Sequence, residues 1–208
     1  MPRFRFHQFR HRLLLLIARQ PSAEQPAESQ LSPPPTALPP AVGHSGGLLI
    51  AVREDLFEFI SSSQGDFFAS MVIRNKLSRL QWEVLNVYGP VHYDRKAAFL
   101  AEIIDYVLQA QGPLLMGGDF NLIRFGDEKS KGALHKTAMV QFNAAIDMMQ
   151  VRELHWVGCR FTWTNKQENP TFEVLDRAFM NGSWETLFPL AITDTLVRVG
   201  SDHNPLRS

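Results

Sequence analysis

The sequence changes character near residue 45, and this change limits where a globular fold can form. Residues 1–20 hold five arginines and no acidic residue, and residues 21–40 are rich in proline, serine, alanine and glutamine. Such a segment cannot bury enough apolar surface to fold alone. We therefore predict a disordered basic and proline-rich extension over residues 1–44 and one globular unit over residues 45–208.

The front segment and the overall charge exclude some classes of protein. The apolar run at residues 13–18 is too short to cross a bilayer, so no membrane span is predicted. A basic, acid-free start fits an amino-terminal targeting peptide, and a nuclear or cytoplasmic location stays open beside it. The 21 basic and 21 acidic residues balance, so any nucleic-acid site must be local.

Beyond residue 45, strand-like runs mix with two amphipathic helices. Helices are expected over residues 94–111 and around residues 139–149, with a helical turn at 183–188. Strands are expected at residues 47–52, 67–73, 82–88, 114–116, 161–164, 172–180 and 192–199. Because strands and helices do not alternate strictly, we predict an α+β fold in which sheets pack together and are covered by helices.

Two polar motifs follow apolar runs. Gly117-Gly118-Asp119-Phe120-Asn121 comes directly after a buried-type strand, and Ser201-Asp202-His203 stands at the end of the last expected strand. Polar groups at the point where a strand gives way to a loop are typical of phosphate and metal sites in α/β proteins. The two motifs indicate metal-assisted phosphate chemistry.

Six motifs, taken in order, resemble the endonuclease/exonuclease/phosphatase superfamily, and most closely the endonuclease domain of plant non-LTR retrotransposon polyproteins. An ordered set is far more specific than any single motif, and this one spans about residues 45–206. The motifs are Ser45-Gly46-Gly47, Asn86-Val87-Tyr88-Gly89-Pro90, Gly118-Asp119-Phe120-Asn121, Phe161-Thr162-Trp163-Thr164, Leu175-Asp176-Arg177 and Ser201-Asp202-His203.

The resemblance implies a four-layer sandwich of two mixed β-sheets flanked by helices. It also implies divalent-metal-dependent hydrolysis of phosphoester bonds, with DNA or another phosphodiester as substrate. Hard oxygen ligands would select Mg²⁺ or Mn²⁺ as the cation. Nothing in the sequence indicates a protein partner.

The resemblance also implies roles at the first polar motif. Asp119 would orient or deprotonate the attacking water, and Asn121 would hydrogen-bond the phosphate or the same water. We expect the period of two in a strand to point both side chains the same way.

At the second motif, His203 would face the scissile phosphate as a base or as a positive donor. Asp176 would bond its other ring nitrogen and fix the tautomer. Asp202 matches a carboxylate beside the metal. Tyr88 would bind the phosphate, although a half-buried strand tyrosine explains it nearly as well. Trp163 fits equally a core position and an aromatic beside the site.

The match fails at the amino terminus. Complete members begin with a strand that bears an asparagine and a second strand that ends in a glutamate, a principal metal ligand; neither precedes Ser45. Glu24 and Glu28 lie in the proline-rich segment and are not assigned that role. We therefore expect weak cation binding, an exposed sheet edge and an amino-terminally truncated, retroelement-derived chain.

Three functions remain open. The first is a magnesium-dependent endonuclease impaired by the missing strand, with a phosphatase on small phosphate esters as a variant of the same chemistry. The second is a catalytically dead module that still binds nucleic acid or phosphate, and the third is a non-functional remnant.

Other polar residues receive no functional role. Four basic residues follow the first motif, but acidic residues interrupt them and we expect a solvated loop: Arg124, Lys129, Lys131 and Lys136. The seven histidines, His135 among them, show no zinc-site spacing. The single cysteine, Cys159, is expected to be a buried thiol.

Overall fold

The computed structural model describes residue 48, residues 50–196 and residues 201–207. The predicted extension over residues 1–44, the Ser45-Gly46-Gly47 motif and residues 197–199 of the last predicted strand lie outside these. The described residues form an α+β fold of mixed β-sheets with a few helices, as predicted. None of the helices described is long and apolar enough to cross a membrane.

A six-stranded sheet carries the fold. Its strands, in spatial order, are β1 (Phe57–Gln64), β2 (Phe68–Asn75), β3 (Gln81–Tyr88), β4 (Leu114–Asp119), β9 (Asp176–Met180) and β5 (Arg152–Glu153). Every neighbouring pair is antiparallel except β3 and β4. A parallel pair needs a crossover connection, which a 3₁₀ turn (Tyr93–Arg95) and helix α1 (Lys96–Gln109) supply. As a result the carboxyl ends of β3 and β4 lie next to each other.

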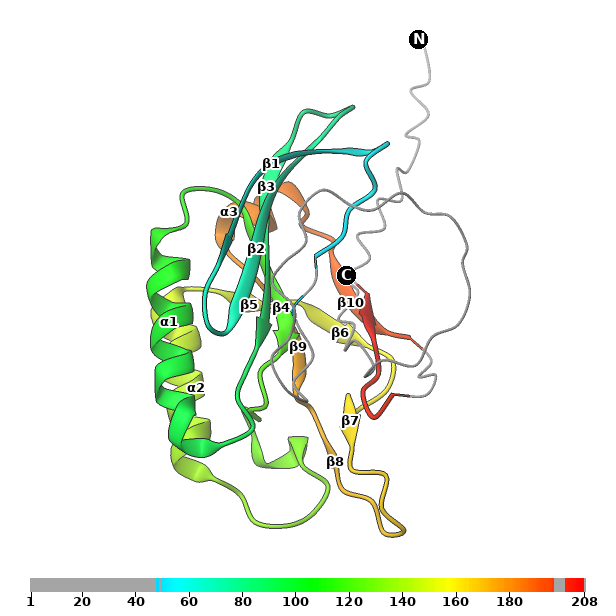
Figure 1. Ribbon diagram of the computed structural model, residues 1–208. Coiled ribbons are helices and arrows are strands. Elements are labelled where there is room, and N and C mark those ends of the chain that lie inside the picture. The colour runs from blue at the N-terminus through cyan, green and yellow to red at the C-terminus, as the bar shows by residue number, and fades with distance from the viewer. Residues whose placement is uncertain (1–47, 49, 197–200, 208) are drawn as a thin grey trace, which may run out of the picture.

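Two helices cover one face of this sheet. Helix α1 and helix α2 (Lys136–Met149) lie side by side against it (Figure 1). Phe99 of α1 and Phe142 of α2 meet Phe120 and Phe179 from the sheet side, and all four side chains are at most 1% exposed. The apolar stripes read from the sequence are therefore the faces that the helices bury.

The opposite face of the sheet is buried as well. Trp82, Val84 and Leu115 point to this side, where Trp184 of helix α3 (Gly182–Leu187) packs against them. Because β4 is buried on both faces, it begins with a continuous apolar run, Leu114-Leu115-Met116, instead of an alternating pattern.

Two smaller sheets complete the described fold. A three-stranded mixed sheet has the order β11 (Leu206–Arg207), β10 (Ile192–Thr195) and β6 (His155–Val157), and a two-stranded sheet pairs β7 (Trp163–Thr164) with β8 (Phe172–Glu173). A short 3₁₀ turn (Gly126–Glu128) follows the first polar motif.

The structure departs from the sequence prediction at several strands, among them β5, β6 and β11, which were not predicted. No strand was predicted at β1, whose side chains are mostly polar and exposed because it lies at the edge of the sheet. Residues 48 and 50–52 form no strand. The strand predicted at 172–180 divides into β8 and β9, because Val174 and Leu175 turn away to bond the loop that follows Asp119.

Two side-chain predictions are also wrong. Cys159 is exposed, since it lies in the turn after β6. The basic residues after the first motif do not simply face solvent: Arg124 bonds Asn143 and Glu153, and Lys129 pairs with Glu173. Sequence spacing shows none of these three partners, because they lie on α2, β5 and β8.

Gly118 gives a test of the β3–β4 packing. Its φ is +149°, and a Cβ added there would lie 2.0 Å from the Val87 carbonyl oxygen. We expect Gly118→Ala to lower the free energy of unfolding by roughly 2–4 kcal/mol, measured by urea denaturation. Gly182→Ala is the matched control, because nothing lies within 4 Å of the added carbon. Equal midpoints for both variants would contradict the packing described.

Candidate active site

Strand register brings three of the predicted residues into one row. Tyr88, at the end of β3, pairs with Asp119 at the end of β4, and Asp119 pairs with Asp176 at the start of β9. Paired residues on neighbouring strands carry their side chains on the same face. Asp119 is 3% exposed and Asp176 is 1% exposed, so two carboxyl groups are buried beside each other, with a half-buried phenol next in the row.

A tight turn joins Asp119 to Asn121. The backbone N–H of Asn121 donates to Asp119 Oδ1 at 2.8 Å. The side-chain Nδ2 of Asn121 donates to Asp119 Oδ2 at 3.0 Å and to the Gly89 carbonyl oxygen at 2.8 Å. Asn121 has φ of +50°, a left-handed conformation that asparagine tolerates better than most residues. The expected period of two was the wrong reason for their contact, because β4 ends at Asp119 and the turn brings the two side chains together.

A buried lysine supports this turn. Lys96, at the start of α1, is 3% exposed, and its Nζ donates to the Asn121 carbonyl oxygen. Burial lowers the pKa of Lys96 to about 8, while the charges of Asp119 and Glu173 oppose that shift. Sequence analysis missed this residue, yet a signal exists: Lys96 occupies the apolar stripe of α1, three residues before Phe99.

His203 lies between the two buried carboxyl groups. Its Nδ1 is 2.9 Å from Asp176 Oδ2, and its Nε2 is 3.8 Å from Asp119 Oδ2. The pairing of His203 with Asp176 that was predicted from the sequence is therefore present. The two carboxyl groups and the imidazole come from segments far apart in the chain.

The His203 segment is held against β7. Trp163 and His203 form an antiparallel bridge, and the Asn204 N–H donates to the Thr162 carbonyl at 2.7 Å. The Trp163 Nε1–H donates to Asp202 Oδ2 at 3.1 Å. Trp163 is thus partly buried and contacts a predicted site residue.

Thr162 positions Asp176 and received no role in the sequence analysis. Its side chain is fully buried, and its Oγ1 accepts hydrogen bonds from the N–H groups of Leu175 and Asp176 at 2.9 and 3.0 Å. Its place in the motif Phe161-Thr162-Trp163-Thr164 was the available signal. Its hydroxyl fixes the backbone at the start of β9.

The electrostatics of the three central groups depend on one another. Burial and then the charge of Asp176 raise the pKa of Asp119 to about 7, against the opposing effects of His203, the Asn121 N–H and Lys96. Burial alone would lower the pKa of His203, but the hydrogen bond and charge of Asp176, with the charges of Asp119 and Asp202, raise it overall. The protonation states of Asp119 and His203 therefore depend on each other.

The described residues do not form a complete metal site. Asp202, the ligand predicted from the sequence, already accepts a hydrogen bond from Trp163. Among residues 48, 50–196 and 201–207, no group of three or more histidines, cysteines or acidic residues is placed to hold a metal ion. A hard divalent cation needs more oxygen ligands than one carboxylate provides.

Solved structures show what the fold resembles. The endonuclease domain of TRAS1, a telomere-specific non-LTR retrotransposon, aligns with a TM-score of 0.57 and 18% identity, covering 74% of this chain and 68% of that one. An endonuclease/exonuclease/phosphatase family protein from Bacteroides thetaiotaomicron aligns at 0.53 and 13%, covering 74% and 65%. An AP endonuclease from Leishmania major aligns at 0.53 and 12%, covering 68% and 53%.

At these identities the likeness establishes the fold. The chain spans between about half and two thirds of the length of these structures, from 53% to 68%. No curated protein matches the chain by sequence. The model of one protein family, however, matches residues 6–203, which is most of the chain. With this match, a fold shared with its members and a site at the strand ends, the chain belongs to the endonuclease/exonuclease/phosphatase family.

Proposed function

We propose that this chain hydrolyses phosphodiester bonds, with DNA as the substrate. The observation that carries the proposal is the imidazole of His203, which lies between two buried carboxyl groups at the edge where β3 and β4 end. A buried acid, a second acid and an imidazole in contact form a proton-transfer system of the kind that hydrolases use.

Each residue then has a role in the attack of water on phosphorus. Asp119 accepts the proton of the water as the bond between water oxygen and phosphorus forms, and Asn121 holds the Asp119 carboxylate in place. His203, held by Asp176, donates a hydrogen bond from Nε2 to a phosphate oxygen and stabilises its growing charge. The bond to the leaving oxygen breaks, this oxygen takes a proton from solvent, and Asp119 releases the proton that it accepted to solvent, so the products are a phosphomonoester and an alcohol.

Tyr88 is the remaining member of the row, beside Asp119 on β3. We propose that its phenol donates to the same phosphate, because its position in the row puts it on the side of Asp119 away from Asp176.

We also keep the four-layer sandwich as the proposed complete fold. The mixed sheets and the likeness to family structures support it.

The substrate and cofactor follow from similarity. A retrotransposon endonuclease domain and an AP endonuclease are among the similar structures, which favours DNA over small phosphate esters as the substrate. The retrotransposon domain also supports the proposal that the chain originates from a retroelement. Members of the family typically use a divalent metal, and we propose Mg²⁺ or Mn²⁺. We expect weak binding, because the described carboxylates form no three-ligand group.

The proposal is tested by nicking of supercoiled plasmid by the purified chain in magnesium. We expect nicking that EDTA abolishes and that His203→Ala reduces by roughly 10²–10⁴-fold, the range for loss of a proton-transfer group. His155→Ala is the matched control, because His155 is an exposed histidine on β6. A protein folded by circular dichroism that leaves the plasmid intact would contradict the proposal and favour a catalytically inactive relative.

The pH dependence tests the role of Asp119. Only the ionised carboxylate accepts a proton, so the rate should rise with pH and level off near the pKa of about 7. At higher pH the rate should fall as His203 loses its proton, which gives a bell-shaped profile in a plasmid-nicking assay. A rate independent of pH between about 5 and 8 would exclude Asp119 as the base.

Lys96 offers a sharper version of this test. Its charge lowers the pKa of Asp119, so Lys96→Met should move the acidic limb of the profile to higher pH. Lys96→Arg keeps the charge and should leave the limb close to its wild-type position. If both variants move the limb equally, the effect comes from altered packing of Asn121 and the charge has no part in it.

A further inference from the structure

The folded part of the chain carries an excess of negative charge. Residues 45–208 hold 16 basic and 19 acidic residues, whereas residues 1–44 hold five basic and two acidic ones. The neutral total therefore combines an acidic domain with a basic front segment. Binding of a nucleic acid strand depends strongly on cations that neutralise its phosphates, so the location of these cations matters for the proposed function.

Most basic side chains of the domain already have acidic partners. The structure describes 15 lysines and arginines, and nine of these form an ion pair with an aspartate or a glutamate. A phosphate that approaches such a cation also meets the carboxylate beside it, so attraction and repulsion largely cancel. The most exposed of the nine side chains, at 62–72%, are those of Arg53, Arg79, Arg152 and Arg160.

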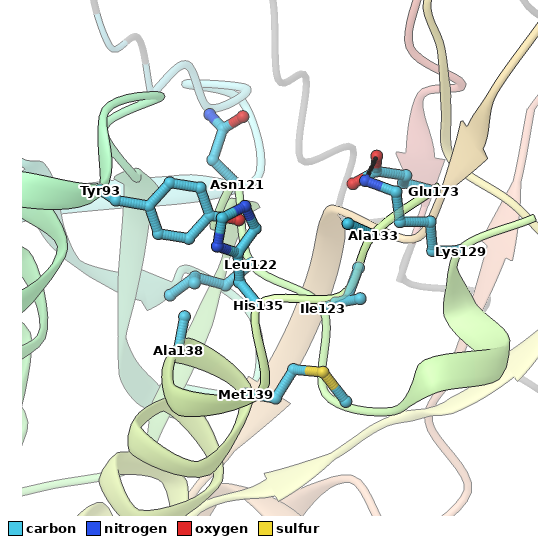
Figure 2. A pocket seen from close by; sticks show the side chains of 10 residues that line it. All are labelled: Tyr93, Asn121, Leu122, Ile123, Lys129, Ala133, His135, Ala138, Met139 and Glu173. Carbon is cyan, nitrogen blue, oxygen red and sulfur yellow. Dashed lines mark ion pairs between the residues drawn. The ribbon is translucent and has the colours of Figure 1, made fainter. Parts of the chain in front are cut away.

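Two lysines next to the candidate active site are engaged too. Figure 2 shows Lys129 and Asn121 around one small cavity, and Lys129 Nζ lies 2.9 Å from Glu173 Oε1. Lys96 is 3% exposed and donates to the Asn121 carbonyl oxygen. Exposed lysines such as Lys136 remain, but the acidic residues of the domain outnumber its basic ones. The domain alone therefore offers a substrate strand little positive charge.

The front segment contains the positive charge that the domain lacks. Residues 3–12, the basic arm, hold four arginines, two histidines, three phenylalanines and no acidic residue. They lie outside the part of the chain that the structure describes, and their charge follows from the sequence alone. Basic amino-terminal arms are typical of nucleic-acid contacts, because each arginine neutralises a phosphate and releases its counterion.

The basic arm can reach a strand held at the active site. Residues 13–47 separate the arm from the first described residue, and a chain of this length spans at most roughly 120 Å. A domain of about 160 residues has a radius of gyration of roughly 15 Å, so this span exceeds its diameter. Once a strand is bound at the site, its contact with the arm is intramolecular, which raises the effective concentration of the arm.

We propose that the basic arm binds the phosphate backbone of the nucleic acid strand on which Asp119 and His203 act. The inference rests on the proposed function, because the active site determines which strand the arm meets. The arm adds affinity without sequence preference, since its contacts go to phosphates. A small phosphate ester has no backbone for the arm to bind, so the arm favours a nucleic acid over such an ester.

The test is the salt dependence of DNA binding by the full chain. Affinity for a short fluorescent duplex is measured by anisotropy at several NaCl concentrations, in EDTA and with His203→Ala in every protein, so no cleavage intervenes. The arm variant combines Arg3→Gln, Arg5→Gln, Arg10→Gln and Arg12→Gln. Each lost phosphate contact removes roughly 0.9 from the slope of log affinity against log salt, so the slope should become shallower by roughly 3–4. Between about 50 and 200 mM NaCl, the parent should lose roughly 60–250-fold more affinity than the variant.

The matched control removes the same charge from the domain. It combines four changes at exposed arginines that have acidic partners: Arg53→Gln, Arg79→Gln, Arg152→Gln and Arg160→Gln. This control should keep the slope of the parent to within about one unit, because each arginine lies beside a carboxylate. Lysine at the same four arm positions keeps the charge and should also keep the slope. Thermal unfolding of each variant shows that the fold is intact.

Two results would overturn the inference: equal slopes for the arm variant and its parent, or equal losses of slope in the arm variant and the domain control. The phenylalanines between the arginines also suit an anionic membrane surface, so binding to phosphatidylserine vesicles is measured in parallel. An arm that vesicle binding requires and DNA binding does not would contradict the inference as well.

None of these measurements depends on turnover. A chain that nicks plasmid with a slope unaffected by the arm would retain the proposed function and lose the arm contact. An inactive chain whose slope depends on the arm would do the reverse.

Discussion

Two carboxyl groups buried side by side are the constraint on which the rest of this site depends. Asp119 and Asp176 are register partners at most 3% exposed, and two like charges in such a place cannot both ionise without a counter-charge. His203 supplies it, with one ring nitrogen 2.9 Å from Asp176 and the other 3.8 Å from Asp119. The same contact couples the two groups that it joins, because His203 lowers the pKa of Asp119 and Asp119 raises the pKa of His203.

This arrangement needs contacts between parts of the chain that are far apart. Asp119 ends a strand set by the parallel β3–β4 pair, Asp176 is fixed by the Thr162 hydroxyl, and His203 reaches the site because its segment is bridged to β7. Each link joins residues separated by at least a dozen positions. Contacts of this kind form late in folding, because loop closure costs entropy before they stabilise anything. The site is therefore complete only in the fully assembled domain.

Hydrophobic periodicity in the sequence predicted the helices and strands whose burial leaves a regular pattern. It found α1, α2 and the apolar strands, because burial of one face leaves a spacing of three and four or a run of apolar residues. It missed β1, where an edge position leaves most side chains in water, and it could not show the partner of Lys129 on β8. The residues that motif resemblance named lie close together in the structure: Asp119, Asn121, Asp176 and His203. Sequence analysis missed Lys96 because a lysine within an apolar stripe only interrupts the hydrophobic pattern. In the structure its Nζ donates a hydrogen bond to the carbonyl oxygen of Asn121.

Formal charges explain why such a site should still require a cation. Asp119, Asp176 and Asp202 contribute three negative charges when ionised, while Lys96 and a protonated His203 contribute two positive ones. A phosphodiester adds one more negative charge, which leaves the substrate complex with an excess of two negative charges.

At an effective dielectric of 20, two unit charges 4 Å apart repel by about 4 kcal/mol, so this excess of negative charge strongly opposes substrate binding. The chain as a whole is neutral and supplies no compensating field. A divalent cation would carry the charge that balances this excess, and the family's typical use of such a cation agrees with the electrostatics of the protein groups alone.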